Sequence, residues 1–142
     1  MRSYGTLTHT TWECKYHVVF IPKCRRKMMY GKLREYLGEL FKGLANMRES
    51  EIEEGHLLPD HVHILISIPP KYSVSEVVGF MKGKSAIQIA KLYMKKERNF
   101  TGQSFWARGF FVSTVGGDEA AIRKYIQNQE DEDRKLEQGR LF

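Results

Sequence analysis

Two histidines, His61 and His63, are separated by a single valine in the segment PDHVHILISIPP (residues 59–70). The many Ile and Val residues of this segment predict an extended strand, in which alternate side chains point to opposite faces. Both imidazoles then lie on one face, while Val62 and Ile64 lie on the other, which is apolar enough to face a core. Two neutral imidazoles at this spacing can bind one divalent metal ion, but a hydrogen-bonded pair without a metal has the same spacing. The motif therefore predicts a metal site only if further ligands reach it.

A second candidate group lies in the segment KYIQNQ (residues 124–129). In a helix, Tyr125 and Gln129 are four residues apart and therefore share one face. The amide oxygen of Gln129 suits a hard ion such as Mg²⁺, and the phenol of Tyr125 can attack phosphorus once it is deprotonated. Alternatively, Tyr125 completes an apolar helix face with Ile122 and Ile126, and the glutamine is solvated. The spacing leaves catalysis and packing both open for the tyrosine.

The elements that would position these residues alternate between strands and helices. Runs of β-branched and aromatic residues bounded by Pro or Gly indicate the strands, and apolar residues three and four apart indicate the helices. We expect strands at 15–22, 50–58, within 59–70 and at 105–115, and helices at 32–47, at 73–94 with an irregularity at Gly83, and at 118–136.

This order is typical of the α+β ferredoxin-like (RRM-like) fold. In that split βαβ sandwich, helices cover one face of a four-stranded antiparallel sheet and leave the other open. His61 and His63 lie on the open face if Val62 faces the core, and the additional C-terminal helix carries Tyr125. No repeat or linker divides the 142 residues, so we expect a single domain over residues 1–142.

The charge of the chain favours a polyanionic partner. It has 23 Lys and Arg residues against 17 Asp and Glu residues, a formal net charge of +6. Such a balance favours phosphate contacts, although many basic domains bind no nucleic acid. Arg25 and Arg26 follow the first expected strand, and Lys82 and Lys84 flank a glycine. We interpret these four as candidate DNA contacts, and the alternative is that they are solvated.

Aromatic residues of the last expected strand have two possible roles. Trp106, Phe110 and Phe111 could stack on unpaired bases. Core packing is the more common role of aromatic side chains in a strand, and it is the interpretation that we favour.

Several classes of protein are disfavoured by what the sequence lacks. The N-terminal residues have no apolar segment typical of a signal peptide, and no stretch approaches the ~18 apolar residues of a membrane span, so we expect a cytoplasmic protein. Cys14 and Cys24 form no CxxC pair, which argues for free thiols. The segment GFMKGKS (residues 79–85) has one residue too few between its glycines for a phosphate-binding loop. A nucleotide cofactor is therefore not expected.

The sequence resembles the single-tyrosine HUH transposases of the insertion sequence 200/605 group along nearly its whole length. The matching segments, in order, are YHVVFIPKCRRK, PDHVHILISIPP, FMKGKSA, WARGFFVSTVG and IRKYIQNQ. The resemblance implies that His61 and His63 are the metal ligands of the HUH motif. It also implies that Gln129 completes the metal site and that Tyr125 is the nucleophile.

The resemblance implies a reaction and partners as well. Members of the family cut single-stranded DNA at transposon ends and form a 5′-phosphotyrosine, with a divalent ion, Mg²⁺ or Mn²⁺, and no nucleotide cofactor. Their substrates carry subterminal hairpins. A homodimer with composite active sites is implied, in which the tyrosine helix can serve the histidines of the partner. Cys24, Phe110 and Gln127 differ from the residues usual in the family, and none of them is a presumed ligand.

Two other functions are compatible with these residues. One is a non-catalytic module of the same fold that binds RNA or single-stranded DNA on its sheet, with an affinity that does not respond to a chelator. The other is a different HUH endonuclease, either a replication initiator or a domesticated repeat-processing transposase. Hairpin-bearing ends beside the gene would indicate a mobile element instead.

Overall fold

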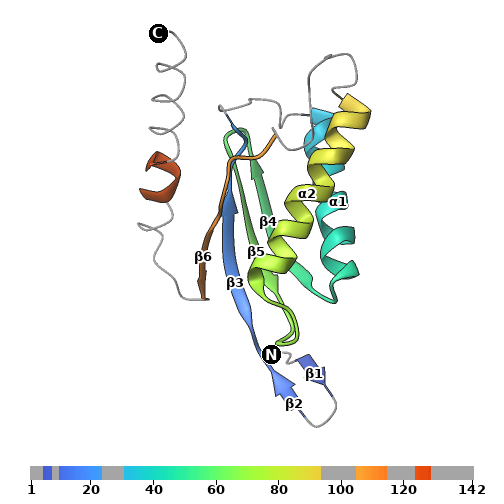
Figure 1. Ribbon diagram of the computed structural model, residues 1–142, viewed down its shortest axis with the longest axis vertical. Coiled ribbons are helices and arrows are strands. Elements are labelled where there is room, and N and C mark those ends of the chain that lie inside the picture. Colours follow the sequence, from blue (N-terminus) through green and yellow to red (C-terminus); the bar gives the residue numbers. More distant parts are fainter. Residues whose placement is uncertain (1–4, 8–9, 24–30, 94–104, 115–123, 129–142) are drawn as a thin grey trace.

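The computed structural model describes residues 5–7, 10–23, 31–93, 105–114 and 124–128. The main elements are β3 (Lys15–Phe20), α1 (Gly31–Met47), β4 (Glu51–Leu58), β5 (His61–Ser67), α2 (Val74–Tyr93) and β6 (Phe111–Thr114). The strands form a four-stranded antiparallel sheet in the order β4-β5-β3-β6, and α1 and α2 lie on one side of it (Figure 1). Two interleaved βαβ units, β3-α1-β4 and β5-α2-β6, produce this order, so the expected α+β ferredoxin-like fold is confirmed.

A small hairpin precedes the main sheet. It pairs β1 (Gly5–Leu7) with β2 (Thr10–Trp12) in a separate two-stranded sheet. We did not expect this hairpin, because its threonine-rich sequence has no alternating apolar face. Cys14, between β2 and β3, is a free cysteine as expected, and Cys24 lies outside the described residues.

The core lies between the sheet and the helices. On β5, burial alternates from residue to residue, so Val62, Ile64 and Ile66 face the helices, as the sequence predicted. On α1, buried apolar residues recur at the expected spacing of three and four. The residues that form this core include Val18, Phe20, Leu33, Leu37, Phe41, Val62, Ile64, Ile66, Val77, Val78, Met81, Ile89 and Trp106.

The second helix begins with a side-chain cap. The hydroxyl of Ser73 accepts a hydrogen bond from the backbone N–H of Glu76 at 3.0 Å. The expected irregularity at Gly83 is wrong, because α2 continues through this residue without a break. Gly83 is exposed, while Met81 before it and Ala86 after it are buried against the core. Tertiary packing on both sides of the glycine therefore outweighs its low helix propensity.

The last strand is shorter than expected. We predicted a strand over residues 105–115, but β6 covers Phe111–Thr114. Before it, Trp106 forms an isolated bridge with Pro22, and Gly109 has a φ angle of +78°. The left-handed conformation of the glycine interrupts the extended run. The first strand likewise ends at Phe20 rather than at residue 22.

The expected C-terminal helix is described in part. Residues 124–128 are helical, and they lie on the side of the sheet opposite to α1 and α2 (Figure 1). The remainder of the predicted range, 118–136, lies outside the described residues. None of the helices in the described part of the chain is long and apolar enough to cross a membrane.

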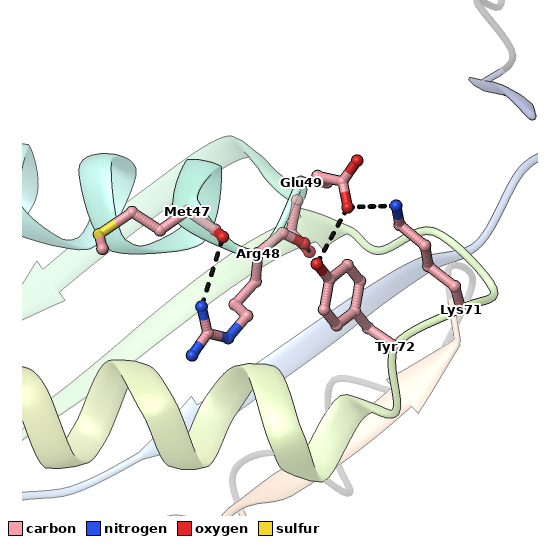
Figure 2. Close-up of polar contacts among 6 residues, drawn as sticks. Met47, Arg48, Glu49, Lys71 and Tyr72 are labelled. Carbon is pink, nitrogen blue, oxygen red and sulfur yellow. Dashed lines mark hydrogen bonds and ion pairs between the residues drawn. The ribbon is translucent and has the colours of Figure 1, made fainter.

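A polar cluster joins the end of α1 to the turn before α2 (Figure 2). The carboxylate of Glu49 accepts a hydrogen bond from the hydroxyl of Tyr72 at 2.9 Å and forms an ion pair with Lys71. The hydrogen bond from Lys71 is the main reason that the pKa of Glu49 is lowered. The guanidinium of Arg48 lies 3.8 Å from the centre of the Phe80 ring. These contacts connect α1 to α2 at one end of the sheet, away from the histidines.

Candidate active site

Imidazoles gather on the face of the sheet that α1 and α2 leave open. Directly opposite His63 are His56 on β4 and Val19 on β3. Val19 is in turn directly opposite Phe111 on β6. Directly opposite residues of an antiparallel pair project to the same face. Because Val18 belongs to the core beneath the helices, Val19 points the other way, and the four residues form one row on the open face. We call them the His63 row.

His63 is held by another imidazole. Its Nε2 atom lies 3.1 Å from Nδ1 of His17, a hydrogen-bonding distance, and the two ring centres are 5.3 Å apart. Burial is the main cause of a lowered pKa of His63, and the neighbouring histidines, His17 first, lower it further. Both effects favour the neutral ring, which is the form that binds metal ions.

His61 is held by a carboxylate. Its Nδ1 atom lies 2.8 Å from Oδ1 of Asp60, and its side chain is only 14% exposed. When Nδ1 donates to the carboxylate, the neutral ring keeps a lone pair on Nε2. Histidine ligands of metal ions typically have such a carboxylate partner. The contact therefore fits the expected role of His61.

Tyr125 lies over the same face, at the edge of the sheet that β6 forms. Its ring centre is 5.6 Å from that of Phe111, with an angle of 40° between the planes. The hydroxyl oxygen of Tyr125 is buried. Since β3 separates β5 from β6, the backbones of His63 and Phe111 are roughly 10 Å apart. The structure thus brings Tyr125 and the two histidines to one face, but at different strands.

The metal-binding residues are incomplete in the described part of the chain. No three His, Cys, Asp or Glu side chains among the described residues are arranged to hold a metal ion. His61 and His63 supply two imidazoles, and Gln129, the expected third ligand, lies outside the described residues. A metal centre at this position therefore needs the C-terminal residues, water or substrate to complete its coordination.

Two of the expected DNA contacts lie on α2, across the sheet from the histidines. The ammonium of Lys82 donates to the carbonyl oxygens of Ala107 at 2.8 Å and Gly109 at 2.7 Å. Burial lowers the pKa of Lys82 to about 8. This lysine secures the segment before β6, whereas Lys84 is exposed and open to a phosphate. Arg25 and Arg26 lie outside the described residues.

The aromatic residues divide between the two faces. Trp106 is buried in the core, where its ring centre is 4.8 Å from that of Phe20, and Phe110 packs at the edge of the core. Phe111 instead lies on the open face beneath Tyr125. Core packing, our favoured interpretation, is therefore confirmed for Trp106.

Sequence reasoning missed three residues around the histidines: His17, His56 and Asp60. The Nε2 atom of His56 donates to a carboxylate oxygen of Glu54 at 2.8 Å, and the ring centre of His56 is 6.2 Å from that of His63. Asp60 could have been found, since it directly precedes His61. His17 and His56 lie on other strands, and only the strand register brings them to His63.

Comparisons with known proteins agree on one family. The family described as "Transposase IS200 like" matches residues 10–129 of this chain. A transposase for insertion sequence element IS200 from Salmonella typhimurium is 41% identical over 133 residues, which are 94% of this chain and 88% of the relative. The ISDra2 transposase TnpA from Deinococcus radiodurans is 27% identical over 123 residues, 86% of this chain and 88% of the relative.

Solved structures have the same fold. A putative transposase from Deinococcus radiodurans superposes with a TM-score of 0.74 at 24% identity, covering 91% of this chain and 97% of the other. A REP-associated tyrosine transposase bound to a REP hairpin superposes with a TM-score of 0.55 at 16% identity, covering 89% of this chain and 68% of the other. At these identities, the superpositions show a shared fold.

Proposed function

Because the chain belongs to the family of IS200-like transposases, we propose that it cleaves and rejoins single-stranded DNA at transposon ends, with Tyr125 as nucleophile. The observation that carries this proposal is the shared face of the sheet. Tyr125 contacts Phe111, which belongs to the same row as His63. His61 lies on the same strand face two residues away. A nucleophile and a pair of imidazoles thus border one open surface on which a DNA strand can lie.

A divalent ion, Mg²⁺ or Mn²⁺, would be held by His61, His63 and Gln129. When bound, it polarises the phosphate under attack and stabilises charge on the attacking or leaving oxygen. Asp60 orients the His61 ring, and burial lowers the pKa of His63 and so favours its neutral form. Both features support the proposal, because imidazoles bind metal ions in the neutral form.

The protein's own chemistry begins at the tyrosine. The Tyr125 phenol gives up its proton, and its oxygen forms a bond to phosphorus while the bond from phosphorus to the 3′ oxygen breaks. The released 3′ oxygen takes up a proton and becomes a free hydroxyl. The ester to Tyr125 retains the bond energy, so a later attack by another 3′ hydroxyl can rejoin DNA. No nucleotide cofactor is needed for this exchange.

We also propose that the active form is a homodimer with composite sites. The spacing across the sheet supports this, because Tyr125 packs on Phe111, whose backbone is roughly 10 Å from that of His63. The buried hydroxyl of Tyr125 must also reach the scissile phosphate. A tyrosine helix that serves the partner's sheet would leave its position over Phe111 and expose the hydroxyl to the phosphate.

The proposed substrate is single-stranded DNA with a subterminal hairpin. A structural relative that is described as bound to a REP hairpin supports this choice. The exposed Lys84 lies on α2, across the sheet from the histidines, and we propose that it contacts phosphates of the bound DNA away from the cleavage site. Arg25 and Arg26 are proposed to contact DNA phosphates as well.

The decisive experiment traps the covalent intermediate. The full chain is incubated with Mn²⁺ or Mg²⁺ and labelled single-stranded DNA from the ends of its element, and SDS-resistant adducts are separated on a gel. Tyr125→Phe should reduce the adduct by more than about 10³-fold, because the phenol oxygen is the nucleophile. EDTA should remove the adduct as well.

Tyr72→Phe is the matched control, because Tyr72 lies in the polar cluster away from the histidines and should leave adduct formation unchanged. An adduct that persists in Tyr125→Phe would reject the assignment of the nucleophile. Chelator-insensitive DNA binding without an adduct at any cognate end would instead favour a non-catalytic binding module.

A further inference from the structure

His17 on β3 makes a direct contact to the candidate metal site that the HUH motif does not include. Its Nδ1 atom lies 3.1 Å from Nε2 of His63, and the planes of the two rings are inclined by 55°. One of these nitrogens donates its N–H to the other. The contact joins residues 46 positions apart in the sequence, so it depends on the pairing of β3 with β5.

The strand register explains why the contact forms. His17 is directly opposite Leu65 on β5 and Ser113 on β6, and it projects to the open face. His63 precedes Leu65 by two residues and is therefore the diagonal neighbour of His17, within reach of a ring side chain. Two paired strands of the central sheet thus hold the imidazoles against each other.

The direction of this hydrogen bond determines whether a ring nitrogen of His63 keeps a lone pair for a metal ion. If His17 donated, the His63 Nε2 atom would accept, and the proton of neutral His63 would lie on Nδ1, leaving no lone pair for a metal ion. If His63 donates its Nε2–H to His17, the Nδ1 atom of His63 keeps its lone pair. Only the second arrangement leaves His63 a ligand while the bond is intact. Histidine ligands typically donate their second ring N–H to such an acceptor.

We propose that His17 is a positioning residue of the metal centre, which fixes the ring orientation and the metal-binding tautomer of His63. This inference rests on the proposed function, because it presupposes that His61 and His63 bind a divalent ion. It predicts that His17 sets the affinity for the ion before any DNA is bound. His17 itself does not contact the metal in this proposal.

The test measures metal binding without DNA. Mn²⁺ is titrated into the full-length protein by calorimetry for the wild type and for His17→Phe, which fills the space but accepts no hydrogen bond. We expect a Kd about 10- to 100-fold weaker in His17→Phe, the range typical for loss of an outer partner of a ligand. His17→Gln retains an acceptor oxygen and should recover most of the affinity.

His56→Phe is the matched control. His56 also lies beside His63, but its ring nitrogen bonds Glu54 instead. Its replacement should leave the Mn²⁺ affinity near that of the wild type. An equal loss in His56→Phe and His17→Phe would mean that any change on this face disturbs the site, and it would overturn the specific role of His17.

A spectrum distinguishes positioning from ligation. At saturating Co²⁺, the visible absorption of His17→Phe should match that of the wild type, because the ligands are the same. A changed spectrum would mean that His17 binds the ion directly, and it would overturn the positioning role. Tighter Mn²⁺ binding in His17→Phe would overturn it as well, because His17 would then compete with the ion for His63.

His61→Ala separates this inference from the proposed function. If His61→Ala weakens Mn²⁺ binding but His17→Phe does not, the inference about His17 is wrong and the metal centre stands. If the wild type binds no ion, or if His61→Ala binds as tightly as the wild type, the proposed metal centre itself is wrong. Circular dichroism of each variant verifies that the sheet is intact.

Discussion

The two faces of the central sheet are built from the same strands but differ in chemistry. Towards the helices, Val62, Ile64 and Ile66 on β5 are at most 2% exposed. Towards the open side, the alternate positions His61, His63 and Leu65 are half-buried. A shift of one residue along β5 thus separates a packed apolar interior from a surface of imidazoles.

The polar groups of the two faces also have different kinds of hydrogen-bond partner. On the open face, each imidazole contacts a side chain from the same surface, as in the pairs His17–His63 and His61–Asp60. On the covered face, the indole N–H of Trp106 donates to the hydroxyl of Ser85, and both residues are buried. The comparison teaches that polar groups of the covered face have buried partners inside the core, whereas those of the open face have partners at the surface, where other ligands can replace them.

The sharpest test of this difference compares neighbouring positions on β5. Ile64→Ala should reduce the free energy of unfolding by about 2–5 kcal/mol, because it leaves a cavity beneath the helices. His61→Ala should reduce it by less, about 1 kcal/mol, because it removes a partly buried ring and its hydrogen bond to Asp60 but opens no cavity in the core. Urea denaturation measures both values.

In the assay that traps the DNA adduct, the same two variants should show the opposite order of effects. His61→Ala should lose the DNA adduct, whereas folded Ile64→Ala should retain it. A loss of stability in His61→Ala as large as that in Ile64→Ala would break the distinction between the two faces.

Much of the fold could be predicted because its signals are local. The alternation of apolar residues along β5 is enough to identify its core positions, and the spacing of Leu33, Leu37 and Phe41 is enough to identify α1. The segment that leads into β6 could not be predicted in the same way. Its extended composition is overridden by a positive φ angle at Gly109 and by the pairing of Trp106 with Pro22, which depends on distant parts of the chain.

The candidate site shows the same limit. The sequence pointed to His61, His63 and Tyr125 because their spacing is a local property. It did not point to His17, although this residue lies in a strand that was predicted, because strand order and register decide which side chains become neighbours. Whether Gln129 joins them stays a prediction, since it lies outside the described residues.

A second test compares the loss of a buried polar contact on the covered face with the loss of an exposed one on the open face. In Ser85→Ala, the N–H of Trp106 loses its acceptor at 2.9 Å inside the core. We expect a loss of about 1–3 kcal/mol in the free energy of unfolding, the cost of a buried donor without a partner. The double variant Ser85→Ala with Trp106→Phe should lose less than the sum of the two single changes.

Glu54→Ala is the matched change on the open face. The carboxylate of Glu54 pairs with His56, and both side chains are more than half exposed. Water can replace this partner, so the stability of Glu54→Ala should match that of the wild type. A loss comparable to that of Ser85→Ala would show that the open face contributes to stability as well.

The smallest expected effect is a difference in response to acid. Burial and the neighbouring imidazoles lower the pKa of His63 below its ordinary value of 6.5. As the pH falls through 6.5, the unfolded chain takes up a proton at this residue before the folded chain does, so acid favours unfolding. The contribution of His63 to the free energy of unfolding is therefore fully present above pH 6.5 and is lost progressively below it.

His63→Gln removes this contribution. In the absence of metal, its urea midpoint should fall less between pH 7.5 and pH 5.5 than that of the wild type. Ile64→Ala changes no titratable group, so its midpoint should fall by the same amount as that of the wild type. Equal drops in all three proteins would mean that the acid response does not come from His63.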